Sequence, residues 1–283
     1  MIAILGGLGA AAMWAAATVC SSRSSRAIGA GPVLAWVMLV GLIATLPFVA
    51  MAGVPPGLDG EAVIWLLLAG TGNVAGLLLE YAALRVGKVG IVAPIASTEG
   101  AVAAVLALIA GERIAPGAGA MLAVIVAGVV LASAAPDGGP LADRPDGRRA
   151  IGLSIAAALF FGVGLYAAGR ISLELPVAWV LLPPRVIGVA AVAIPLAASG
   201  RLRTPGRVWP LVVASGVCEI AGFALFALGA RDQIAVAAVL ASQFAALAAI
   251  GAYVLFRERL RSVQLAGVVA IACGVAVLTW LQA

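Results

Sequence analysis

Four ionisable side chains lie inside stretches of sequence that are otherwise apolar: Glu80, Glu99, Arg185 and Glu219. A charge inside a lipid bilayer costs about 3 kcal/mol or more unless it faces a cavity or a partner, so each is a candidate functional residue. Histidine is absent from the sequence, which excludes histidine triads, histidine metal sites and histidine proton relays. Any proton chemistry in this chain must therefore use carboxyl groups.

Glu99 lies deepest within its apolar stretch. It is about eleven residues from the end of the segment 89–110, roughly 16 Å at ~1.5 Å per residue, which places it near the bilayer midplane. A carboxyl group there could load and release a proton as access alternates between the two sides of the membrane. The alternative is a hydrogen bond to Ser97 or Thr98 with no role in transport. We expect Glu99 to be the coupling site.

Arg185 and Glu219 are predicted to lie at matching depths, within roughly 4 Å of each other along the helix axes. They could form a buried ion pair with a structural role. Alternatively, Arg185 could hold a substrate carboxylate through two hydrogen bonds while Glu219 takes an amine. Glu80 lies near the end of its segment, where we expect it to reach Arg85 or the membrane interface. Asn73, two turns before Glu80, is expected at midplane depth.

The composition predicts the elements that must position these groups. Of the 283 residues, 64% are hydrophobic and 10% are charged, whereas a soluble domain is roughly half apolar and about a quarter charged. A helix needs about 20 apolar residues to cross the membrane. The sequence therefore predicts an all-α integral membrane protein of ten transmembrane helices, over residues 2–20, 32–53, 62–84, 89–110, 117–135, 150–169, 176–198, 208–229, 233–255 and 263–281.

A repeated pattern divides these helices into two halves. Tyr81-Ala82-Ala83-Leu84 precedes Gly111-Glu112-Arg113-Ile114, and after about 145 residues Phe226-Ala227-Leu228 precedes Arg257-Glu258-Arg259-Leu260 with a similar spacing. Repeats of this kind are typical of transporters. Five helices in each copy, an odd number, require the second copy to be inverted, so the fold is predicted as two inverted five-helix repeats around a central cavity.

The same register pairs the polar positions of the two halves. Asn73 aligns with Glu219, and the triplet Ser97-Thr98-Glu99 aligns with Ser242-Gln243. These residues are predicted to be symmetry-related parts of one substrate-binding and coupling site. The predicted units are the first repeat at 1–135, a polar linker at 136–149 and the second repeat at 150–283.

These features resemble the drug/metabolite transporter superfamily, specifically its ten-helix EamA-type branch. The resemblance covers both repeats and implies a transporter whose central cavity is formed by helices 1–4 and 6–9, with helices 5 and 10 outside it. It also implies that Trp14 and Tyr81 line this cavity. Where the first half has Pro94 the second has Ala238-Val239, so the two half-sites need not bend alike. The residues that carry the resemblance are Trp14 before small residues, Tyr81-x-x-Leu84, Pro94, Gly111-Glu112-Arg113 and Glu258-Arg259.

We therefore expect a secondary active transporter that exports a small metabolite, such as an amino acid or related compound, or a drug, by alternating access. No ATP-binding Gly-x-x-x-x-Gly-Lys-Ser/Thr loop is present, so the energy must come from a gradient, and coupling to protons is predicted through Glu99 before Glu219. The expected partners are a small-molecule substrate, membrane lipids and protons, without cofactor, metal or nucleic acid, in a monomer or weak dimer. The protein is not expected to be an enzyme.

Two other functions fit the same scaffold. A membrane-embedded enzyme would usually need clustered acids, histidines or a metal at an aqueous face. A non-transporting assembly factor or sensor would tolerate Glu99→Gln.

The distribution of basic residues predicts the orientation in the cell inner membrane. With a cytoplasmic N-terminus, the cytoplasmic loops would hold only Arg113, Arg170 and Arg231, and the opposite loops most of the 17 lysines and arginines. Because these residues prefer the cytoplasmic side, both termini are predicted to lie outside the cytoplasm, although most relatives are expected to have cytoplasmic termini.

Overall fold

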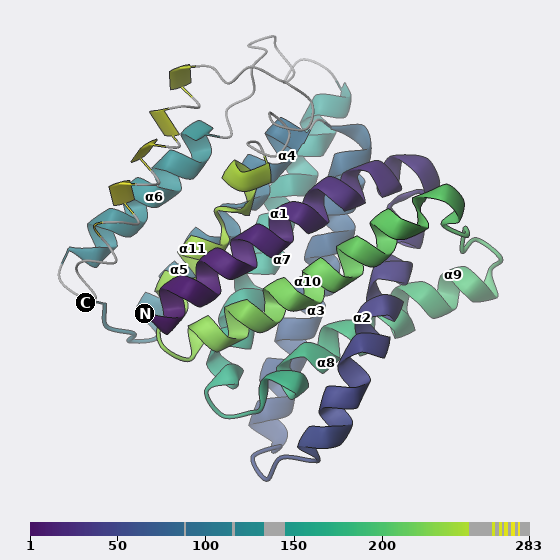
Figure 1. Ribbon diagram of the computed structural model, residues 1–283, viewed down its shortest axis with the longest axis horizontal. Helices are drawn as coiled ribbons and strands as arrows, with labels where there is room; N and C mark the ends of the chain where they lie inside the picture. The colour runs from purple at the N-terminus through teal and green to yellow at the C-terminus, as the bar shows by residue number, and fades with distance from the viewer. Residues whose placement is uncertain are drawn as a thin grey trace.

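The computed structural model of the chain describes residues 1–87, 89–114, 117–132 and 145–248, with separated residues between 262 and 277. Every regular element within these ranges is a helix (Figure 1). Residues 136–144 of the predicted linker and the motif at 257–260 lie outside the described residues, as does much of the last predicted helix, 263–281. The count of ten helices therefore stays a prediction.

Within the described ranges, six helices are long and apolar enough to cross a membrane, so the chain is a multi-pass membrane protein. They are α1 (Ile2–Ile28), α2 (Ala30–Ala52), α3 (Gly60–Val86), α7 (Pro145–Ser172), the continuous helix of α8 (Val177–Gly188), a π-helical turn (Val189–Ala193) and α9 (Ile194–Ala198), and α10 (Trp209–Ala230). The shorter apolar helices are α4 (Val89–Ala96), α5 (Glu99–Ile109), α6 (Ala118–Ala132) and α11 (Ile234–Ala241).

Two predicted helix boundaries are wrong. α1 continues to Ile28, although the sequence predicts its end at residue 20, where a run of serines and arginines begins. Ser21 and Ser24 are fully buried and donate hydrogen bonds to backbone carbonyls one turn earlier. The serines therefore satisfy their hydroxyls within the helix and pack against the protein. Likewise, α7 begins at Pro145, inside the predicted linker 136–149.

Two of the apolar segments are interrupted at equivalent positions. Helical structure stops at residues 97–98 between α4 and α5, and at residues 242–243 after α11. The hydroxyls of Thr98 and Ser242 each donate to a carbonyl three residues earlier, both at 2.7 Å. Because the second break has no counterpart of Pro94, proline is not required for it, and both half-sites bend despite the difference in sequence.

The long helices pack in antiparallel pairs, α1 against α10 and α3 against α7. Figure 1 shows α1 and α10 side by side across the molecule. Glycines at both contacts bring the backbones together: a Cβ at Gly6 would lie 2.7 Å from the Cα of Gly229, and one at Gly72 would lie 2.7 Å from the Cα of Gly164. Small residues at such crossings allow close packing where no hydrophobic effect drives association.

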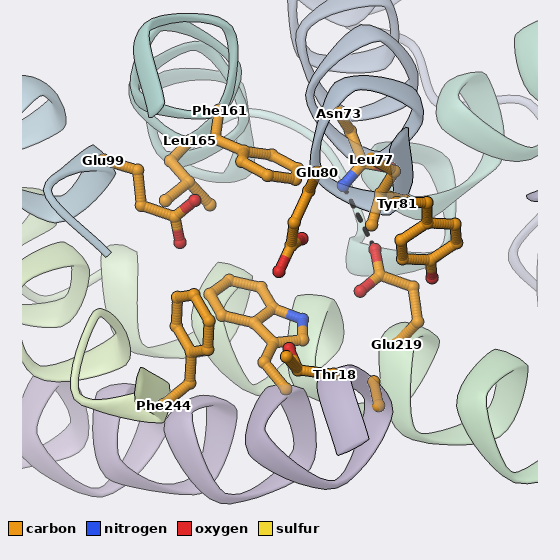
Figure 2. Close-up of a pocket in the computed structure, with 12 residues that line it drawn as sticks. Thr18, Asn73, Leu77, Glu80, Tyr81, Glu99, Phe161, Leu165, Glu219 and Phe244 are labelled. Carbon is orange, nitrogen blue, oxygen red and sulfur yellow. Dashed lines mark hydrogen bonds between the residues drawn. The ribbon is translucent and has the colours of Figure 1, made fainter. Parts of the chain in front are cut away.

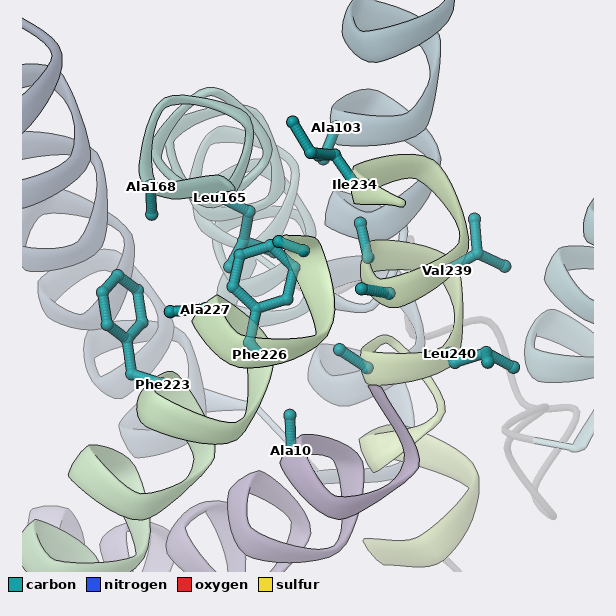
Figure 3. Close-up of a cluster of buried hydrophobic side chains, with 14 of the residues drawn as sticks. Ala10, Ala103, Leu165, Ala168, Phe223, Phe226, Ala227, Ile234, Val239 and Leu240 are labelled. Carbon is teal, nitrogen blue, oxygen red and sulfur yellow. The ribbon is translucent and has the colours of Figure 1, made fainter. Parts of the chain in front are cut away.

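α11 lies in the centre of the helix bundle, and all eight of its residues are buried. Figure 3 shows Ile234 and Val239 of α11 in one apolar cluster with Phe226 of α10 and Ala103 of α5. The cluster fixes the interrupted helix against the long pair α1 and α10.

A side chain from the first half caps this helix. Glu112 accepts hydrogen bonds from the backbone N–H groups of Ile234 (3.2 Å) and Ala235 (3.1 Å), which satisfies two of the free donors at the start of α11. Burial raises the pKa of the Glu112 carboxyl, and these two hydrogen bonds act in the opposite direction. Glu112, in the Gly-Glu-Arg motif of the first half, thus caps α11 in the second half.

The α3–α7 crossing gives the first testable prediction. Gly72→Ala should lower the thermal unfolding midpoint of the purified protein, because the added Cβ would lie 2.6 Å from the carbonyl oxygen of Phe160 and force the helices apart. Gly152→Ala on α7 is the matched control, since nothing lies within 4 Å of its Cβ position and alanine favours a helix by about 1 kcal/mol. An unchanged midpoint for Gly72→Ala would contradict the close contact.

Candidate functional site

A cavity lies between α1, α3, α7 and α10, and about 420 Å³ of space in and around it, open solvent included, is not filled by protein atoms. The start of α5 and the residue that follows the break after α11 also contribute to its wall. Figure 2 shows the cavity with its lining side chains. They are Trp14, Ala17, Thr18, Asn73, Leu77, Glu80, Tyr81, Glu99, Phe161, Leu165, Glu219 and Phe244.

Three carboxylates from three helices face this cavity. Glu80 is on α3, Glu99 is the first residue of α5 and Glu219 is in the middle of α10. Their exposed fractions are 4%, 3% and 4%, and Figure 2 shows all three side chains directed inward. The cavity therefore holds acidic groups at a depth where bulk water does not solvate them.

Glu219 is held by two neighbours. Its Oε1 accepts a hydrogen bond from Asn73 Nδ2 at 3.1 Å and lies 3.6 Å from Nη2 of Arg185. The ion pair considered from the matching depths is therefore present. Arg185 is fully buried, also donates from Nη1 to the sulfur of Met38 at 3.6 Å, and does not line the cavity. Its guanidinium faces Glu219 from behind the wall and not from the substrate side.

The expectation for Glu80 is wrong. The side chain does not extend to Arg85, which is exposed, or to the membrane interface. It lines the cavity, and its Oε1 has no hydrogen-bond partner in the described part of the chain. Glu80 lies near the end of α3 but on the face that packs against α1 and α7. Glu80 lies two helical turns after Asn73, on the same face of α3. This spacing was the sequence signal that could have placed Glu80 at the cavity.

Apart from Arg185, which lies behind Glu219, the structure separates the predicted site residues into two groups. Five line the cavity: Trp14, Asn73, Tyr81, Glu99 and Glu219. Four lie at the helix breaks and outside the lining: Ser97, Thr98, Ser242 and Gln243.

Two lining residues, Phe161 and Phe244, are outside the predicted site, although the sequence suggests Phe161 among several aromatic residues that could line a pocket. Phe161 occupies the position equivalent to Trp14, and Phe244 the position equivalent to Glu99. Extending the repeat alignment to these positions would have identified both.

Two of the aromatic rings pack directly against glycines of the facing helix. A Cβ at Gly222 would lie 2.6 Å from the indole of Trp14, and one at Gly76 would lie 2.5 Å from the ring of Phe161. Because each ring fills the space where a side chain would otherwise be, its position at the cavity is fixed by the packing of α1 on α10 and of α3 on α7.

Residues 1–134 match the EamA-like transporter family, which is part of the drug/metabolite transporter superfamily. None of the curated proteins matches the sequence. The chain is similar to a solved structure whose title reads "Crystal structure of protein", with 21% identity, a TM-score of 0.78, and coverage of 99% of this chain and 96% of that one. This likeness concerns the fold alone. Residues 1–134 are therefore similar to the EamA-like transporter family, as the motifs of this half predict, and this match indicates a drug/metabolite-type transporter.

The Arg185–Glu219 pair gives a prediction about stability. Arg185→Met and Glu219→Gln should each lower the free energy of unfolding by about 3–5 kcal/mol, because each leaves one buried charge without its partner. The double variant should lose less than the sum of the two single losses. Unfolding of the purified variants in detergent measures all three, and additive losses would mean that the two groups do not interact.

Proposed function

We propose that this chain is a secondary active transporter that exports a small metabolite or drug by alternating access. The observation that carries the proposal is the cavity with three buried carboxylates, enclosed by long apolar helices. Charged groups at membrane depth are typical of substrate and ion pathways. We further propose, from the distribution of basic residues, that the protein lies in the cell inner membrane with both termini outside the cytoplasm.

The proposed architecture is two inverted repeats, residues 1–135 and 150–283. Packing between the halves supports it, because reciprocal contacts recur at equivalent positions. A Cβ at Gly41 would lie 2.8 Å from Cδ of Arg185, and one at Gly188 would lie 2.3 Å from Cγ of Met38. Met38 and Arg185 are 147 residues apart, as are Gly41 and Gly188. Gly41 therefore lies against Arg185, the counterpart of Met38, while Gly188, the counterpart of Gly41, lies against Met38. Reciprocal contacts of this kind are expected across a two-fold axis.

The helix directions support inversion of the second repeat. α1 runs antiparallel to α10, and α3 runs antiparallel to α7. With α1 equivalent to α7 and α3 equivalent to α10, equivalent helices run in opposite directions across the membrane. In such a transporter the two halves can exchange conformations around a central site, so that the cavity opens first to one side and then to the other.

Proton coupling is proposed through Glu99. A carboxyl group can hold a proton in one state and release it in another when its exposure to water changes. The charged and titratable groups around the cavity that act on Glu99 are Glu80 and Glu219, with Tyr81 in the lining and Arg185 behind Glu219. No basic residue lines the cavity in the described part of the chain, so Glu99 has no fixed positive partner there.

Alternating access can be tested without knowing the substrate. In a variant without Cys20, Cys218 and Cys273, Ala17→Cys would place a thiol on the cavity wall. A membrane-impermeant thiol reagent should modify it from either side of a proteoliposome membrane, because both conformations are visited. The neighbouring Ala16→Cys, on the exposed face of α1, should resist a charged reagent from both sides. Modification of Ala17→Cys from one side only would refute alternating access and favour an enzyme or a sensor.

Coupling gives a separate prediction. Glu99→Gln keeps the size and hydrogen bonding of the side chain but cannot titrate, so it should abolish accumulation of substrate driven by a pH gradient while leaving binding measurable. Uptake of a panel of amino acids and cationic dyes into proteoliposomes after a pH step measures this. If Glu99→Gln still concentrates a panel member against its gradient, Glu99 does not carry the proton, and Glu219→Gln and Glu80→Gln become the next variants to measure.

A further inference from the structure

We propose that the cavity takes a small organic cation, in which an ammonium group with N–H donors is joined to an apolar, aromatic body. The inference rests on the proposed function and names the substrate class of the same cavity. It separates this class from zwitterionic amino acids, which the sequence suggests among the candidate substrates, and from anions.

The first argument is charge. Three carboxylates face the cavity, and its lining within the described residues includes no lysine or arginine. Arg185 compensates Glu219 at 3.6 Å, which leaves Glu80 and Glu99 without a cationic partner among the described residues. Like charges repel strongly where the effective dielectric constant is low. A carboxylate on the substrate would therefore meet repulsion here, whereas an ammonium group would be attracted.

The second argument is the set of unpaired hydrogen-bonding atoms. Glu80 Oε1 and Asn73 Oδ1 are buried acceptors with no partner in the described part of the chain, and both residues line the cavity. Buried polar atoms are normally paired, so these two acceptors favour a ligand that brings donors. Within the described ranges the indole N–H of Trp14 is an unpaired donor, which a hydroxyl or carbonyl oxygen on the ligand could satisfy.

The third argument is the apolar part of the wall. Figure 2 shows the carboxylate of Glu99 pointing into the space that Phe161 and Phe244 border. Trp14 and Tyr81 add two further rings to the lining. Aromatic faces attract cations and also bury an apolar body. A carboxylate surrounded by rings thus favours a cation with an aromatic or aliphatic substituent over a small inorganic ion.

Three probes that share one aromatic skeleton test the charge preference. Phenethylamine is a cation, phenylalanine is a zwitterion and 3-phenylpropanoate is an anion. Calorimetric titration of the purified full chain in detergent at neutral pH should give a dissociation constant for phenethylamine at least about tenfold below those of the other two. Equal or tighter binding of phenylalanine or 3-phenylpropanoate, or binding of none of the three, would overturn the proposal.

A variant tests whether Glu80 recognises the ammonium group. Glu80→Gln should weaken phenethylamine binding by at least about tenfold, because it removes the charge and keeps the shape. The same substitution at Glu61, which is exposed near the start of α3, should leave binding unchanged. Full affinity in a folded Glu80→Gln protein would remove Glu80 from the site. If that variant does not fold, the comparison of the three probes on the unmodified protein still decides the charge preference.

The outcome is separable from that of the proposed function. Two-sided modification of Ala17→Cys together with preferred binding of phenylalanine would retain the transporter and reject the cation. One-sided modification together with preferred binding of phenethylamine would retain the cation site and reject alternating access.

Discussion

The fully buried guanidinium of Arg185 constrains the helices around it. A buried charge is tolerated only with a partner, and the partner here is Glu219 at 3.6 Å, which Asn73 orients by a hydrogen bond at 3.1 Å. The absence of a side chain at Gly41 leaves space for the arginine, since a Cβ there would lie 2.8 Å from its Cδ. α2, α3, α8 and α10 are thus joined at one polar contact, and the helices that carry the cavity pack around it.

The two proposed repeats share one framework, but they contribute different chemistry to the cavity. Asn73 and Glu219, at equivalent positions 146 residues apart, bond to each other, as expected for residues next to a two-fold axis. Away from that axis the equivalents differ: Glu80 corresponds to Phe226, and Glu99 to Phe244. Two of the three acids therefore come from the first half, and each has a ring as its counterpart in the second.

Hydropathy predicted the long spans because a membrane helix requires about 20 apolar residues, and the repeat aligned Asn73 with Glu219 before any contact was known. Other features depend on which face of a helix is buried, and an apolar sequence carries little information about this. From the sequence alone, the serines after residue 20 are therefore predicted to lie beyond the end of the helix, and Glu80 is expected to reach Arg85 or the interface. The packing of Phe161 into the space left by Gly76 is likewise a relation between two helices that no local pattern records.

The position of each acid relative to the proposed axis indicates which acids could couple a gradient to the proposed transport. A ligand shifts a two-state equilibrium only by its difference in affinity for the two states. When two equivalent halves exchange conformations, a contact on the axis between counterparts, such as that of Asn73 with Glu219, keeps similar surroundings in both states and contributes little to that difference. Glu80 and Glu99 lie off the axis, opposite rings and not opposite acids, so their surroundings change when the halves exchange roles. In the proposed transporter, a proton or an ammonium group bound there would therefore gain or lose stability as the cavity changes sides, which is the requirement for coupling a gradient to export.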